Sequence, residues 1–141
     1  MRTLAFLAVL AALSAGAGAD GALNTLTVEI DGVGTRGGVL HVGVYDAASY
    51  AAGTNPILAR TVKAVPGRAM VTFVGITPGI YAVKAVQDVN LNGAHDKTLL
   101  GATAEPMGYS NTADRRDRPA FRVIQFTVTA GDNRAVVHMH E

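Results

Sequence analysis

The chain has 141 residues, a length typical of one domain, and its lack of cysteine excludes disulfides and thiol chemistry. Removing Arg2, which lies in the export signal described below, from the 12 basic residues leaves 11, equal to the 11 acidic residues. This balance gives no electrostatic reason to expect nucleic acid or an anionic membrane surface as a partner. Hydrophobic residues make up 49% of the chain and aromatic residues only 6%, so we expect a core of Val, Ile, Leu and Ala.

The first part of the chain is typical of a cleavable export signal. Arg2 supplies a positive start, residues 4–13 are apolar, and Ala17, Gly18 and Ala19 are the small residues of a signal-peptidase site. The apolar run is about half of the ~20 residues that a membrane-spanning helix needs. We therefore expect a signal peptide over 1–19, a mature domain over 20–141 in the periplasm or outside the cell, and no membrane insertion after cleavage.

The mature chain repeatedly alternates apolar and polar residues, which is typical of strands with one buried face. Turn-forming residues separate these runs, and residues 46–56 form a polar stretch with room for one helical turn. The fold class that this pattern predicts is all-β, a single antiparallel Greek-key β-sandwich of about seven strands. In chain order, the expected strands are 26–30, 39–45, 57–65, 69–73, 80–87, 123–128 and 135–140.

One long segment, 88–119, has no sustained period and is rich in Asn, Asp, Gly and Arg. Irregular stretches longer than about 15 residues are uncommon in compact domains and are often functional. We therefore expect one long irregular loop, and we expect it to carry the site.

Two sets of motifs resemble known families. Residues 77–83 (TPGIYAV) resemble the Pro-Gly-x-Tyr motif of transthyretin-like and collagen-adhesin B-type sandwiches. There the Pro-Gly pair makes a turn, and we expect Tyr81 to bury its ring while its hydroxyl holds a connecting loop. Residues 87–96 (QDVNLNGAHD), 105–111 (EPMGYSN) and 119–121 (PAF) resemble a bacterial exported family catalogued as domain of unknown function 2141.

That second resemblance implies a secreted sandwich and supplies no known activity. The chain departs from the family pattern at Gln87, where the family often has His, so a role for that imidazole does not carry over. Thr112 and Ala113 interrupt an expected run of Asn, which weakens any inference about that loop.

The start of the irregular segment has the spacing of a calcium loop. Asp88, Asn90, Asn92 and Asp96 occupy relative positions 1, 3, 5 and 9, and a Gly stands at position 6 as in EF-hand loops. Ala94 can add its backbone carbonyl. The alternative is an ordinary turn in which Asp and Asn side chains bond their own backbone.

The EF-hand pattern is incomplete, because position 12 is Leu99 instead of Glu. The missing ligands must come from water or from Glu105, Asp114 or Asp117 in the same segment. With few carboxylates, we expect calcium affinity to be modest.

Other side chains of this segment are candidates for ligand or partner contact; they are Tyr109, Ser110, Asn111, Arg115 and Arg116. The first three can equally be structural turn residues, whereas for the arginines, which cluster with Asp114 and Asp117, we favour a solvated and self-paired charged loop. His138 and His140 can present two imidazoles on one side of a strand and chelate copper or zinc, with His41 or Glu141 as a third ligand. They can also simply decorate a terminal edge strand, which is the reading that we favour.

These observations favour an exported, non-enzymatic binding or structural module whose loop binds calcium and whose partner is an unknown cell-envelope component or protein. The alternative is a small hydrolase or carbohydrate-active enzyme that uses Asp88, His95 or Asp96 near the arginines of 115–118. The mature chain has only Ser49 and Ser110 as serines, and neither lies in a Gly-x-Ser-x-Gly motif.

Overall fold

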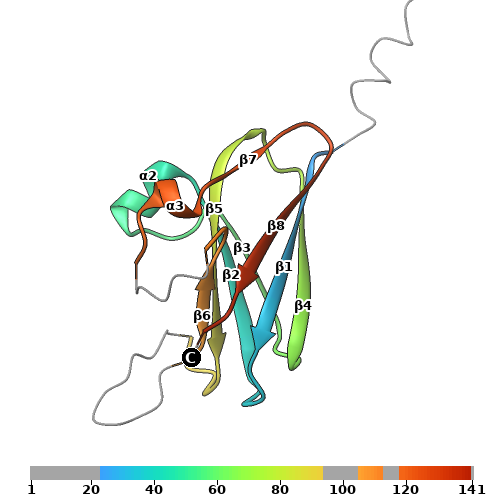
Figure 1. Ribbon diagram of the computed structural model, residues 1–141, viewed down its shortest axis with the longest axis vertical. Coiled ribbons are helices and arrows are strands. Elements are labelled where there is room, and N and C mark those ends of the chain that lie inside the picture. Colours follow the sequence, from blue (N-terminus) through green and yellow to red (C-terminus); the bar gives the residue numbers. More distant parts are fainter. Residues whose placement is uncertain (1–22, 94–104, 113–117, 141) are drawn as a thin grey trace, which may run out of the picture.

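The computed structural model describes residues 23–93, 105–112 and 118–140. These residues form two facing sheets with two short helices at one side (Figure 1). The bounds in chain order are β1 Thr25–Val33, β2 Val39–Tyr45, α2 Ala47–Ala52, β3 Leu58–Lys63, β4 Gly67–Val74, β5 Gly79–Asp88, β6 Met107–Tyr109, α3 Phe121–Ile124, β7 Phe126–Val128 and β8 Asp132–His138.

The first sheet has the order β4-β1-β8, and the second has the order β3-β2-β5-β6 with β7 also paired to β5. The all-β sandwich expected from the sequence is therefore confirmed. The predicted strand 39–45 matches β2 at both ends, and its alternation is seen in the burial of Leu40, Val42 and Val44. A side-chain period of two is a local property of the chain, which is why the sequence reveals it.

One strand pair departs from the antiparallel arrangement that we expected. β1 and β8 pair in parallel, with Thr25 opposite Asp132 and Asp31 opposite His138, so the first sheet is mixed. Alternation along a strand identifies its buried face but says nothing of the direction of its neighbour.

Two other expectations need correction. Residues Phe121–Ile124 form the helical turn α3, so the strand expected over 123–128 is confined to β7. Ile124 is fully buried in a small second cluster with Tyr50, Ala82 and Tyr109. It is the buried residue of α3. The segment expected to be irregular also contains β6, which pairs with β5.

The main core lies between the two sheets and consists of the inward side chains of their strands. Tyr81 behaves as expected, because its ring is buried and its hydroxyl donates to the carbonyl of Thr77 at 2.6 Å. The expected helical turn in 46–56 is α2, which Asp46 begins by accepting a hydrogen bond from the amide of Ser49.

Candidate functional site at the end of strand β5

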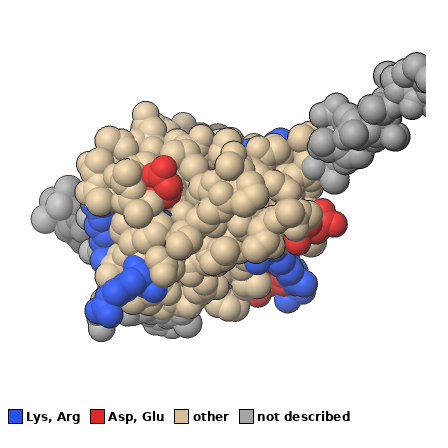
Figure 2. Space-filling view, turned by 90° about the horizontal axis from the view of Figure 1, so that it is seen from above, with Lys and Arg blue, Asp and Glu red and all other residues tan. Residues whose placement is uncertain are grey.

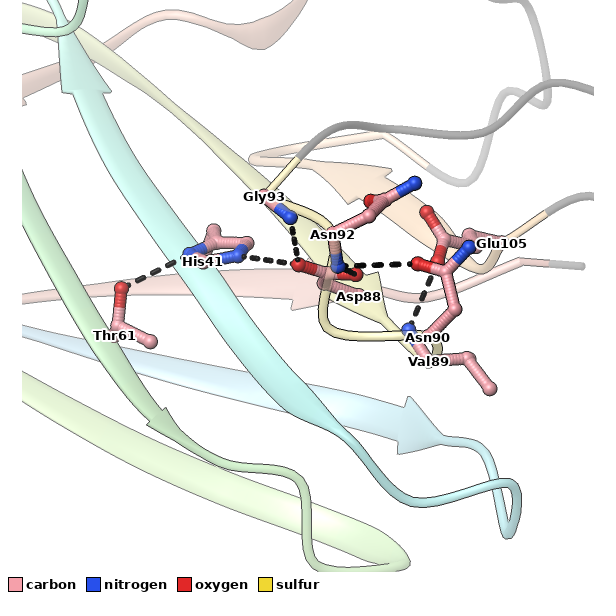
Figure 3. Close-up of polar contacts among 8 residues, drawn as sticks. All are labelled: His41, Thr61, Asp88, Val89, Asn90, Asn92, Gly93 and Glu105. Carbon is pink, nitrogen blue, oxygen red and sulfur yellow. Dashed lines mark hydrogen bonds and ion pairs between the residues drawn. The ribbon is translucent and has the colours of Figure 1, made fainter.

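Asp88 is the last residue of β5, and its side chain is 1% exposed. Its Oδ2 atom accepts hydrogen bonds from the amide of Gly93 at 2.8 Å and lies 3.1 Å from Nε2 of His41 (Figure 3). Its Oδ1 atom accepts from the amide of Asn92 at 3.1 Å. The carboxylate thus joins the end of one strand, the neighbouring strand β2 and the loop that follows it.

These contacts decide the charge of Asp88. Burial raises the pKa of the carboxyl group, but the hydrogen bonds from His41, Gly93 and Asn92 outweigh burial and leave the pKa below its ordinary value. Asp88 is therefore ionised at neutral pH.

The imidazole of His41 connects Asp88 to a hydroxyl group. His41 and Thr61 are opposite residues of β2 and β3, and Nδ1 of His41 lies 2.9 Å from Oγ1 of Thr61. The His41 side chain is 39% exposed, so this row of carboxylate, imidazole and hydroxyl runs from a buried group to the surface. Such an order of groups can move a proton to or from the hydroxyl.

A shallow hollow of about 180 Å³ lies beside this row on the outer face of the second sheet. Its lining includes His41, Tyr45, Pro56, Lys84 and Val86. No sequence pattern predicts this hollow, because it is assembled from β2, β3 and β5 and from the segment that precedes β3.

The loop after Asp88 turns sharply. Leu91 and Gly93 both have positive φ angles, 58° and 76°, and the Oδ1 atom of Asn90 accepts a weak hydrogen bond from the amide of Asn92 at 3.3 Å. Glu105 closes the other side, because its Oε1 atom accepts from the amide of Val89 at 2.9 Å (Figure 3). Glu105 is 4% exposed, so a second carboxylate is buried close to the loop.

Of the expected calcium ligands, the structure therefore places Asp88, Asn90 and Asn92 in one tight turn. Ala94 and Asp96 lie outside the described residues, as do His95, Leu99, Asp114 and Asp117. Within the described residues, no group of three or more His, Cys, Asp or Glu side chains is arranged to hold a metal ion. Within the described residues, the oxygen atoms beside Asp88 in this turn are therefore mainly amide oxygens of Asn and backbone carbonyls.

Gln87, which precedes Asp88, is fully buried and holds the turn between β1 and β2. Its Oε1 atom accepts from the amide of Gly34 at 2.9 Å, and its Nε2 atom donates to the carbonyls of Gly34 at 3.1 Å and Gly37 at 2.8 Å. Gly38, with φ of 82°, lies so close to this strand end that an added Cβ would be 2.1 Å from the carbonyl oxygen of Asp88. The only sequence feature that pointed to Gln87 was its departure from the family's His, and that departure did not predict this role.

The expected contact residues of 109–111 have mostly structural positions. Tyr109 is 4% exposed and Ser110 is fully buried, so neither offers a surface to a partner. The hydroxyl of Ser110 donates to the carbonyl of Ile124 at 2.6 Å and accepts from the amide of Val83 at 2.9 Å. Asn111 is exposed and donates to the carbonyl of Gln125 at 2.7 Å. Arg115 and Arg116 lie outside the described residues.

Arg118, the one arginine of 115–118 that lies within the described residues, packs on α2. Its guanidinium lies 5.0 Å from the ring centre of Tyr50 and donates to the carbonyl of the same residue. The hydroxyl of Tyr50 donates to the carbonyl of Pro119 at 2.5 Å. Arg118 therefore helps to hold α2 against the segment that leads to α3.

The two C-terminal histidines do not form a pair along one strand. β8 ends at His138, whose Nδ1 atom lies 3.7 Å from Oδ2 of Asp31, whereas His140 forms an isolated bridge with Met107. The two residues thus contact different neighbours, and Glu141, one candidate for a third ligand in the less favoured chelating reading, lies outside the described residues.

The fold and this site define a small β-sandwich in which buried polar side chains secure the turns at the end of β5. A family model described as "Uncharacterized protein conserved in bacteria (DUF2141)" matches residues 28–136, and the chain belongs to that family. No curated protein matches the chain, and no solved structure matches it. Among the described residues, no helix is both long and apolar enough to cross a membrane.

Proposed function

We propose that this chain is an exported, non-enzymatic β-sandwich module that recognises a cell-envelope component or protein and binds calcium in the loop after β5. The observation that carries the proposal is the ionised carboxylate of Asp88, held on a rigid strand end at the first position of an Asp-x-Asn-x-Asn-Gly turn.

Among the described residues, the contacts of Asp88 leave capacity for an ion. A carboxylate has about four lone-pair sites, and His41, Gly93 and Asn92 occupy three of them within the described part of the chain. The exposed side chains of Asn90 and Asn92 bring further oxygen atoms to the same turn. Calcium favours such a set of carboxylate, amide and backbone oxygens in an irregular loop.

The use of the buried polar side chains supports a structural or binding role over a catalytic one. Gln87, Glu105 and Ser110 each form a hydrogen bond with a backbone group of a turn or strand end. The likeness of residues 77–83 to transthyretin-like and adhesin B-type sandwiches agrees with a module that binds partners.

One end of the sandwich suits a partner that is recognised mainly through uncharged groups. Figure 2 shows this end from above, where most of the surface is uncharged and the charged side chains lie in separate groups. Leu23, which precedes β1, is 66% exposed, and Ile80, near the start of β5, is 51% exposed.

Calcium titration by calorimetry tests the proposal. Binding of calcium by the wild-type protein and its loss in the Asp88→Asn variant are expected, while Asp46→Asn, which changes a carboxylate at the start of α2, should leave binding unchanged. Hydrogen bonds like those of Asp88 also form in turns that bind no ion. A wild-type titration that shows no heat of binding at millimolar calcium would identify the loop as such a turn and reject the calcium site.

The row from Asp88 through His41 to Thr61 favours a second candidate, a small cell-envelope hydrolase. Its test is hydrolysis of ester and glycoside substrates by the wild-type protein and by Thr61→Val. Turnover that the substitution abolishes would replace the non-enzymatic proposal, and equal background rates in both proteins would reject the hydrolase.

A further inference from the structure

Strand β4 forms an edge of the first sheet. Within the described residues it pairs with β1 along its whole length and with no other strand. In Figure 1 it lies at the outer border of the sandwich, on the side away from α2 and α3. One row of its backbone groups therefore faces outward.

The hydrogen-bond pattern identifies those outward groups. The amide of Gly75 donates to the carbonyl of Asn24 at 2.8 Å, and this pair continues the register of β1 and β4 by one residue beyond Thr25 and Val74, which are opposite each other. In an antiparallel ladder, hydrogen-bonded and non-hydrogen-bonded pairs alternate. The residues whose backbone bonds β1 are thus Ala69, Val71 and Phe73, and the residues whose backbone faces the open edge are Arg68, Met70, Thr72 and Val74.

Two of these four outward residues carry exposed apolar side chains. Met70 is 62% exposed and Val74 is 57% exposed. The one charged residue of the strand, Arg68, is engaged on the sheet face with Asp31 at 2.7 Å and Glu29 at 3.2 Å. A long, apolar strand edge is a template for pairing with another strand unless charges block it.

The edge strand β3 of the second sheet is blocked in this way. β3 has six residues, and its exposed Arg60 and Lys63 place two cations on it. Arg60 is opposite Val42, whose side chain is buried in the core, so the arginine lies on the inward face of the edge strand. Inward charges of this kind prevent edge-to-edge pairing, and β4, with eight residues and one cation, lacks them.

We propose that the open edge of β4 pairs antiparallel with the β4 edge of a second copy of this chain, across a two-fold axis at Val71. This register places Met70 opposite the partner's Thr72 and Arg68 opposite the partner's Val74. All four residues have outward backbone groups, so each opposite pair exchanges hydrogen bonds. The two three-stranded sheets become one continuous sheet.

The strand is compatible with pairing to a second copy of itself in this register. A two-fold axis at Val71 keeps each side chain on its own face of the sheet, because opposite positions differ by an even number of residues. The two arginines stand opposite valines and not opposite each other, which avoids like-charge repulsion. A single strand pair buries far less than the ~1,600 Å² of a standard interface, so the dimer should be weak and concentration-dependent.

Sedimentation velocity of the purified protein from about 10 μM to about 1 mM tests the dimer, since weak interfaces dissociate in this range. Amide hydrogen exchange at both ends of the range tests the register. The amides of Met70 and Thr72 should be slower to exchange at high concentration, whereas those of Ala69, Val71 and Phe73 should be protected at both. A monomer throughout, or a dimer without this alternating protection, overturns the proposal.

A charge at the edge provides the matched variant. Met70→Lys, at an exposed position that leaves the fold intact, should raise the dissociation constant about tenfold or more. Val123→Lys adds the same charge at an exposed position on α3 and should leave the dimer unchanged. Equal dimerisation of Met70→Lys and wild type would place the interface elsewhere and reject the β4 edge.

Discussion

Gln87 and Gly34 exchange two hydrogen bonds, from the amide of Gly34 to Oε1 at 2.9 Å and from Nε2 to the carbonyl of Gly34 at 3.1 Å. The amide group of the Gln87 side chain thus donates to and accepts from the same residue, as a backbone peptide group does in a strand pair, and the side chain is fully buried. The turn between β1 and β2 is thereby tied to the residue next to Asp88.

Replacement of Gln87 by Leu should lower the free energy of unfolding by about 1–3 kcal/mol, because backbone groups near Gly34 and Gly37 lose their partner. Urea unfolding followed by circular dichroism measures the change. Gln125→Leu, at an exposed position, should change stability by less than about 0.5 kcal/mol. Equal effects of the two substitutions would mean that the buried amide contributes nothing specific.

Calcium should raise the melting temperature of the wild-type protein. For a site with Kd of ~10⁻⁴ M in a millimolar calcium bath, the increase is roughly 3–8 °C. Magnesium should have a smaller effect, because it tolerates irregular coordination less well. Asp88→Ala should abolish the increment, and His138→Ala should retain it. The same melting temperature in calcium and in chelator would leave the loop as a turn without an ion.

The start of α2 should respond to acid. Hydrogen bonds from the amide and hydroxyl of Ser49 lower the pKa of Asp46 below its ordinary value. The stabilisation is therefore complete above about pH 3.9, the ordinary pKa of Asp, and is lost as the pH falls through the lower pKa of the folded protein. Urea unfolding of wild type and Asp46→Ala from pH 2 to 7 should show their difference in stability vanish in acid. A difference that is constant with pH would contradict this role.

Gly108 allows β6 and β8 to approach each other. A Cβ at this position would lie 2.2 Å from the carbonyl oxygen of His138, which is backbone and cannot rotate away. Gly108→Ala should therefore lower the free energy of unfolding by about 1–3 kcal/mol or more. Hydrogen exchange should show lost protection at the amides of Met107 and His140, which bond each other's carbonyls, while the ladder of β1 and β4 is retained. Unchanged exchange at Met107 would refute this account.

Export is also open to direct measurement. Mass spectrometry of the protein from its native host should show a chain that begins at Asp20, because the small residues before it suit signal peptidase. A folded population that retains Met1 would contradict the predicted cleavage.

The sequence by itself determined the all-β class and the buried faces of most strands. Leu40, Val42 and Val44 alternate with polar or small residues, and this period of two follows from the geometry of any strand, whatever its neighbour. The Pro78-Gly79 turn, the role of Tyr81 and the family were likewise readable, because each depends on a short run of residues.

Only the tertiary structure decided which strands pair and what the buried polar groups do. The parallel pairing of β1 with β8 joins residues more than a hundred positions apart, and His41 meets Asp88 because β2 and β5 are neighbours. Residues 123–124 adopt a helical turn despite their strand-like alternation, and in this turn Ile124 is buried in the cluster with Tyr50 and Tyr109. Burial and long-range hydrogen bonding override local preference where the two conflict, and neither can be read from the spacing of residues along the chain.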